Sequence, residues 1–180
     1  MALRNTSERW GTLAKLLHWL VAIGLFTLIY YGLLQSDMER GPERLAVRET
    51  HASLALLVFV LMTVRLAWRF LNETPANPEG TPGWQRAAAK LVHGGLYLFV
   101  FLQILAGAMT VATGGRPLPF FGLFSVPLPV AEDADAHHFW EEVHEFSWAI
   151  IAMLIVAHVV AALYDHFVLK NDVLRRMTHG

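Results

Sequence analysis

Four histidines of this chain stand at or inside strongly apolar segments: His18, His51, His144 and His158. A neutral imidazole inside a membrane usually has a function, and binding a metal or haem iron is the commonest one. His144 and His158 are fourteen residues apart within one apolar run. On an α-helix this spacing places them about 21 Å apart along the axis and about 40° apart around it. It therefore predicts one ligand near each face of a membrane, which suits two stacked haems.

The segments that must position these histidines are long and apolar. Only 16% of the residues are charged, and the mean hydropathy is +0.42. Four runs approach the ~20 residues that a membrane-spanning helix needs. They are residues 16–34, 52–71, 91–112 and 146–163. We predict an all-α integral membrane four-helix bundle in which residues 1–180 form a single domain. The first run is too long for a signal peptide and no small-x-small cleavage site follows it, so we expect it to be retained.

The distribution of basic residues predicts the orientation of the bundle. Ten lie on one side of the membrane and four on the other if the spans alternate. The first group is Arg4, Arg9, Lys15, Arg65, Arg69, Arg86, Lys90, Lys170, Arg175 and Arg176; the second is Arg40, Arg44, Arg48 and Arg116. The positive-inside rule then predicts that both termini are cytoplasmic. We expect a lipid bilayer and redox molecules as partners, and no nucleic acid.

This orientation sorts the histidines into two levels. His18 and His158 fall near the cytoplasmic face, and His51 and His144 fall near the opposite face. Two imidazoles saturate a haem iron, which favours electron transfer over oxygen binding. The chain has no cysteine, so thiolate-held clusters and covalent c-type haem are excluded. The alternative is that each histidine makes an ordinary polar contact between helices. Two pairs at matching depths favour ligation.

Several other polar residues have more than one interpretation. His93 is level with His18 and His158; it is interpreted as a hydrogen-bond donor to a haem propionate or quinone, as a packing residue, or as an alternative ligand. Arg65 and Arg69 reach either lipid phosphates or haem propionates.

Arg48, one helical turn before His51, and Arg116 are the equivalent candidates on the outer side. His137 and His138 lie among glutamates at a spacing of four residues. This is interpreted as the acidic first turn of a helix, capped by Asp133 or Asp135, rather than as a metal site. The apolar loop at residues 113–130 is expected either to cover the outer haem or to anchor at the membrane surface.

Five segments together resemble the bacterial cytochrome b561 family of four-helix, di-haem b proteins of the inner membrane. The resemblance covers nearly the whole chain, and the ligand positions of the family fall on His18, His51, His144 and His158. The segments are LLHWLVAIG, RETHASLALLVFVLMTVRLAWR, KLVHGGLYLFVFLQILAGAMT, GGRPLPFFGL and HEFSWAIIAMLIVAHVVAALYDHFVLKNDVLRRM.

The resemblance implies transmembrane electron transfer through two haems b in a multi-pass inner-membrane protein. It further implies oxidation of superoxide at the periplasmic face and reduction of ubiquinone. Arg48 and Arg116 are our candidates for attracting the anion, because Arg48 is adjacent in helical register to His51 and Arg116 lies in the loop expected to cover the outer haem. Ten acidic residues on the outer side oppose that substrate unless the two arginines form a local positive region. An alternative is a di-haem carrier between the quinol pool and a periplasmic or membrane redox partner. A histidine-lined metal or ion transporter is a more distant alternative, because the spans lack acidic residues.

Overall fold

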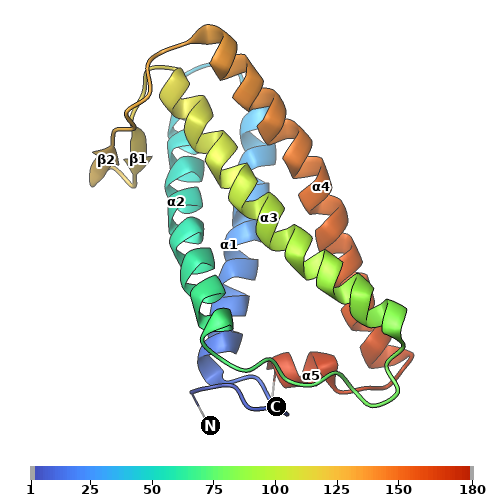
Figure 1. Cartoon of the computed structure of the whole chain (residues 1–180). Helices are drawn as coiled ribbons and strands as arrows, with labels where there is room; N and C mark the ends of the chain where they lie inside the picture. The colour runs from blue at the N-terminus through green and yellow to red at the C-terminus, as the bar shows by residue number, and fades with distance from the viewer. Residues whose placement is uncertain (1–2, 179–180) are drawn as a thin grey trace.

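The computed structural model describes residues 3–178, and four long helices dominate it (Figure 1). They are α1 (Thr12–Ser36), α2 (Pro42–Phe70), α3 (Gly83–Thr113) and α4 (Ala134–Phe167), and all four are long and apolar enough to cross a membrane. The prediction of an all-α membrane bundle is confirmed. Each helix is longer than the corresponding predicted apolar run, and three of the runs lie entirely within their helices. The exception is the second run, predicted at residues 52–71, because α2 ends at Phe70.

The helices begin and end at residues suited to those positions. Pro42 occupies the first turn of α2, where its missing N–H has no helical partner to lose. Asp133 caps α4, and its carboxylate accepts the backbone N–H of Ala136 at 2.8 Å. Helix α3 ends at Thr113; Gly114 is its C-cap and is followed by Gly115 at φ +72°, a left-handed conformation that favours glycine.

The four helices are arranged as two pairs. Helix α1 packs along α2 and α3 packs along α4, whereas contacts between α2 and α3 are few. A small residue permits the close approach of α1 and α2, because a Cβ added at Gly24 would lie 2.6 Å from Cγ2 of Val58. The fully buried side chains that join all four helices form one cluster at mid-height: Val21, Leu28, Val58, Met62, Val100 and Ile151.

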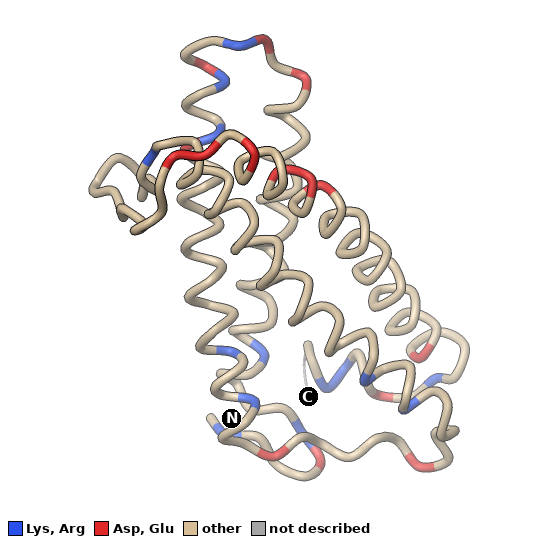
Figure 2. The backbone as a smooth tube through the Cα atoms, turned by 45° about the horizontal axis from the view of Figure 1, so that its top comes forward, with Lys and Arg blue, Asp and Glu red and all other residues tan. Residues whose placement is uncertain are grey.

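Both described ends of the chain lie at the same end of the bundle (Figure 1). Figure 2 shows that the middle of the bundle carries no charged residue and that acidic residues gather at the opposite end. Many large apolar side chains along the helices point outward, among them Ile23, Phe26 and Met153. An exposed apolar belt between two charged ends is the surface expected of a protein surrounded by lipid.

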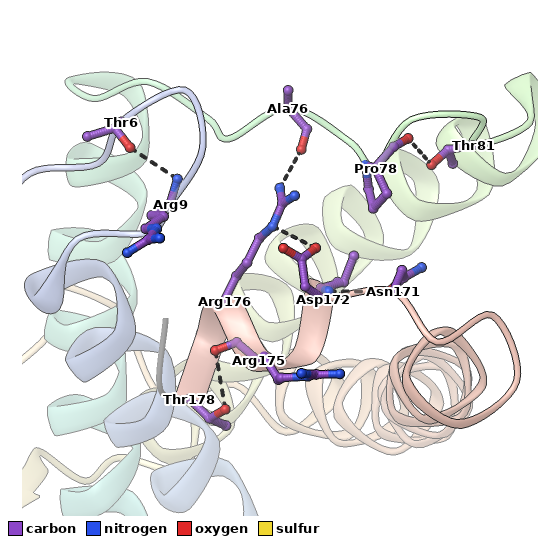
Figure 3. A network of polar contacts seen from close by, with 11 residues as sticks. Thr6, Arg9, Ala76, Pro78, Thr81, Asn171, Asp172, Arg175, Arg176 and Thr178 are labelled. Atoms are coloured by element: carbon purple, nitrogen blue, oxygen red, sulfur yellow. Dashed lines mark hydrogen bonds and ion pairs between the residues drawn. The ribbon is translucent and has the colours of Figure 1, made fainter.

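At the end of the bundle that carries the termini, the C-terminal segment is held by a network of polar contacts (Figure 3). The C-terminal helix α5 (Val173–Thr178) is held by Arg176, whose Nη1 donates to the carbonyl oxygen of Ala76 at 2.8 Å and whose Nε lies 2.8 Å from Asp172. The hydrogen bond from Arg176 lowers the pKa of the Asp172 carboxyl. Trp19 of α1 donates its indole N–H to the carbonyl oxygen of Met177 at 2.9 Å. The C-terminal segment therefore contacts both the α2–α3 connection and α1.

At the other end, the apolar loop between α3 and α4 contains a β-hairpin, where only a loop was expected. Strand β1 (Leu118–Phe120) pairs antiparallel with β2 (Phe124–Val126). Strand β1 packs against α2, where the Oγ of Ser53 accepts the N–H of Phe121 at 2.9 Å and lies 3.2 Å from the carbonyl oxygen of Pro119. The hairpin is thus attached to α2 two residues after His51.

Candidate functional site

The histidines predicted to lie near the cytoplasmic face come together at the end of the bundle that carries the termini. His18 from α1 and His158 from α4 have ring centres 6.1 Å apart. His93 from α3 also reaches this group, with its ring centre 5.1 Å from that of His158. Trp19 packs edge-on against His18, so the tryptophan that binds the C-terminal segment also contacts this site.

The second pair lies at the opposite end of the bundle. After their predicted depths, His18 and His158 are called the inner pair, and this second pair and its end of the bundle are called outer. His51 from α2 and His144 from α4 have ring centres 6.4 Å apart. Two glycines leave room for these rings. A Cβ added at Gly107 would lie 3.2 Å from Cδ2 of His144, and one added at Gly32 would lie 3.6 Å from Cε1 of His51. The depth argument therefore predicted both pairs correctly as neighbours in space.

The spacing within each pair fits a metal atom held between two imidazoles. Metal–histidine bonds of about 2 Å place the centres of two opposed rings about 6 Å apart. The His18–His158 and His51–His144 separations of 6.1 and 6.4 Å match this value. The 5.1 Å between His93 and His158 is too short for that arrangement and corresponds to direct ring contact. The geometry thus favours His18 over His93 as the partner of His158.

Polar neighbours fix the orientation of one ring in each pair. At the inner pair, Nη1 of Arg65 lies 2.7 Å from Nδ1 of His18, and its Nε donates to the hydroxyl of Tyr97 at 3.1 Å. Arg65 therefore contacts a histidine of this pair, a partner that neither of its two interpretations included.

At the outer pair, the amide Nε2 of Gln103 lies 2.9 Å from Nε2 of His144, and Ser147 donates a hydrogen bond to the Gln103 carbonyl oxygen. Ser147 is completely buried. Sequence reasoning missed this pair. The signal was available, because a glutamine inside an apolar span is uncommon and usually finds a polar partner.

A cavity of about 830 Å³ opens between the two helix pairs at the outer end and includes His51 and His144 in its wall. Its volume is within the roughly 300–1,000 Å³ of small-molecule and cofactor pockets. Its wall is mostly apolar and comes from all four helices and the hairpin. Leu118 and Pro119 of β1 form part of this wall, so the apolar loop lies beside the cavity.

Charged residues of both signs line the mouth of this cavity. Three of the four arginines on this side contribute, and they are close enough to influence one another: Arg44, Arg48 and Arg116. Three of the ten acidic residues on this side also line it: Glu49, Glu141 and Glu145. The lining therefore carries three positive and three negative side chains, and the other acidic residues of this side lie outside it.

The histidine–glutamate segment at the start of α4 forms local side-chain pairs. His137 and His138 pair with Glu141 and Glu142 at 3.3 and 3.5 Å, and the Nδ1 of His137 lies 2.8 Å from the carbonyl oxygen of Thr110. No cluster of three acidic or histidine side chains within residues 3–178 is arranged to hold a metal ion. With Asp133 as the cap, the segment is the acidic first turn that was the favoured interpretation.

Comparison with known proteins identifies the family. The sequence profile described as prokaryotic cytochrome b561 matches residues 9–180. The chain belongs to the prokaryotic cytochrome b561 family. It is 30% identical over 190 residues to cytochrome b561 homolog 2 of Escherichia coli (strain K12), covering 98% of this chain and 95% of that protein. It is 34% identical to cytochrome b561 homolog 1 of the same organism, covering 89% and 92%.

A third relative is cytochrome b562 of Cereibacter sphaeroides, which is 31% identical and covered to 89% on both sides. Membership of the cytochrome b561 family establishes haem b as the cofactor and transmembrane electron transfer as the activity. It also establishes that this is a bacterial membrane protein. The opposed histidines, with nitrogen donors at the spacing described above, are a donor set that haem iron accepts.

Proposed function

We propose that this cytochrome b561 binds two haems b, one between His51 and His144 and one between His18 and His158. The observation that carries the proposal is the pair of matching ring separations, 6.4 and 6.1 Å, at two levels of one helix. Haem b supplies reversible one-electron chemistry when it is bound. The helices supply the ligands, hold them at fixed depths and exclude water from the space between the two levels, where the buried apolar cluster lies.

We propose the inner bacterial membrane as its location, with both termini in the cytoplasm, because the basic residues are concentrated at the end that carries the termini. The cavity beside His51 and His144 then faces the periplasm. In this orientation His93, Arg65 and Tyr97 are the polar side chains beside the cytoplasmic pair. Arg65 and His93 are our candidates for contacts with haem propionates or a quinone headgroup.

The electron donor that we propose is superoxide, and the acceptor is ubiquinone. Two superoxide anions oxidised to dioxygen release two electrons, which together with two protons reduce one quinone to the quinol. The support for an anionic donor is the presence of Arg44, Arg48 and Arg116 in the lining of the cavity, beside the three glutamates. Arg48 and Arg116 are close enough to influence one another, and their charges would supply a local positive region within a lining that is neutral overall. Arg48 and Arg116 are the residues to which we assign this role.

The second candidate function is a carrier between the quinol pool and a periplasmic or membrane redox partner. The acidic residues outside the cavity favour it, because a negatively charged rim suits a basic partner protein. A histidine-lined transporter is not supported, since the middle of the bundle carries no charged residue.

The ligands are tested by His144→Ala and His158→Ala. Each variant leaves one haem with a single protein ligand, so each should lose one of two haems while the remaining haem keeps its low-spin spectrum. The haem content per chain is measured as the pyridine haemochrome. Full occupancy of both sites in both variants would show that the ligands are other residues.

The substrate is tested by the rate at which superoxide reduces the protein. Exposed charges act through a field screened over about 8 Å at physiological ionic strength, so the rate should fall with added salt. It should also fall in Arg116→Gln and Arg48→Gln at unchanged haem content. Arg40→Gln is the matched control, because Arg40 is exposed on the same side but does not line the cavity. Slow reduction by superoxide, indifferent to salt and to these substitutions but fast with quinol, would establish the carrier function instead.

A further inference from the structure

The β-hairpin between α3 and α4 exposes an apolar surface. Residues 117–131 include no charged side chain, although Arg116 and Glu132 flank them directly. At the tip of the hairpin, Phe121, Leu123 and Phe124 are 46%, 77% and 55% exposed. In water such a contiguous group of large apolar side chains is unfavourable, and it usually marks a contact with another apolar phase or molecule.

The turn of the hairpin holds an aromatic residue in a conformation that it does not favour. Phe121 has φ +48° and Gly122 has φ +70°, and the N–H of Leu123 donates to the carbonyl oxygen of Phe120 at 2.9 Å. Two successive positive φ values define the turn type in which asparagine, aspartate and glycine are strongly preferred. Glycine occupies one position, but phenylalanine occupies the other at a conformational cost. We infer that phenylalanine at position 121 serves a purpose other than forming the turn.

The hairpin lies at a depth where lipid is available. It is attached to α2 at Ser53, seventeen residues before the end of that helix at Phe70. At 1.5 Å per residue this is about 26 Å along the axis, close to the roughly 30 Å thickness of the hydrocarbon core. In Figures 1 and 2 the hairpin projects sideways from the bundle beside α2 instead of lying across its end. Its tip therefore points along the outer membrane surface.

We propose that this hairpin is a membrane-interface anchor, in which Phe121, Leu123 and Phe124 insert among the lipids of the outer leaflet. The partner is the boundary between headgroups and acyl chains, where amphipathic segments with exposed aromatic residues partition. Because β1 is continuous with this tip and forms part of the cavity wall, the anchor would also hold this part of the wall in place. The proposal does not depend on which substrate enters that cavity.

The absence of cysteine from the chain makes a direct test simple. Leu123→Cys supplies a single thiol at the exposed tip, and Glu39→Cys supplies one at an exposed position in the α1–α2 connection on the same side. Each variant is labelled with an environment-sensitive fluorophore and reconstituted with haem into vesicles of phosphatidylethanolamine and phosphatidylglycerol. Quenching is measured by adding lipids with a nitroxide near the headgroup end of the acyl chain. The ratio of intensities with and without nitroxide removes any constant quenching by haem.

We expect the label at position 123 to be quenched several-fold and the label at position 39 to be nearly unaffected. Introducing Phe121→Asn and Phe124→Ser beside Leu123→Cys should reduce the quenching, because asparagine suits the turn but no longer supplies an apolar side chain. Equal, weak quenching at both positions would overturn the proposal. So would self-quenching at position 123 that disappears on dilution with unlabelled protein, since a second copy of the chain would then cover the tip.

Discussion

Gly107→Ala is a precise test of the outer histidine pair, because the new methyl group meets His144 directly. The added Cβ would lie 3.2 Å from Cδ2 and 3.4 Å from Nε2 of that ring. Non-bonded carbon atoms prefer separations of about 3.5–4.0 Å, so the ring must move by about 0.3 Å or more. Metal–ligand distances tolerate only about 0.2 Å of change. Disturbing the support of a ligating histidine typically weakens metal binding about 10–100-fold, and we expect a loss of this size for the outer haem alone.

The chain offers a graded set of controls for this substitution. A Cβ added at Gly94, on the same helix α3, meets nothing within 4 Å, so Gly94→Ala should leave both haems unchanged. At Gly32 the nearest atom of His51 would be 3.6 Å away, an ordinary contact, so Gly32→Ala should have a small effect. Haem affinity is measured by titrating the haem-depleted protein or by following transfer of haem to apomyoglobin. Equal affinity in Gly107→Ala and Gly94→Ala, or a loss confined to the inner haem, would refute the assignment of His144.

Three further predictions address the side chains beside the histidine pairs and the contacts of the C-terminal segment. His93→Phe should retain two low-spin haems and change only the inner redox potential or quinone turnover; a high-spin haem in its optical spectrum would instead make His93 a ligand. Ser147→Ala removes the hydrogen bond to Gln103, which in turn contacts His144. A redox titration should show a changed potential for the outer haem and an unchanged potential for the inner haem. If neither potential changes, Gln103 does not act on His144. Arg176→Gln should speed proteolysis of the C-terminal segment, and acidification should do the same in the unmodified protein. The pKa of Asp172 is lowered in the folded state, so its contribution is fully present above the usual pKa of a carboxyl and is lost as the pH falls from there through the lowered pKa. Equal cleavage rates above and below this pH window would contradict the prediction.

The features predicted from sequence are those that depend on local order along the chain. Four long apolar runs are sufficient to predict four membrane helices, because a bilayer demands about 20 residues of helix wherever the chain crosses it. The fourteen-residue spacing of His144 and His158 places them at two depths without any knowledge of packing. The alternation of helix direction then assigns His18 and His51 to the correct partners.

The features that sequence reasoning missed depend on contacts between distant segments. Strands β1 and β2 have three residues each, too few for a recognisable alternation, and their turn lacks the asparagine or glycine pair that usually signals a hairpin. The contact of Arg65 with His18 joins residues 47 positions apart. From the sequence, lipid phosphates and haem propionates were the two partners considered for this arginine, and only the packing of α1 on α2 brings it to His18.

The position of the histidines also bears on what holds the bundle together. Helix α4 contributes one ring to each pair, and both of its partners, His18 on α1 and His51 on α2, belong to the other helix pair. Direct packing between the two helix pairs is sparse compared with the packing inside each pair, and it is concentrated in the apolar cluster between the two histidine levels. Ligation at both levels would therefore join the helix pairs above and below that cluster. Binding that favours the assembled bundle stabilises it in proportion to the affinity of the cofactor, so haem should contribute to the cohesion of this protein as well as to its electron transfer.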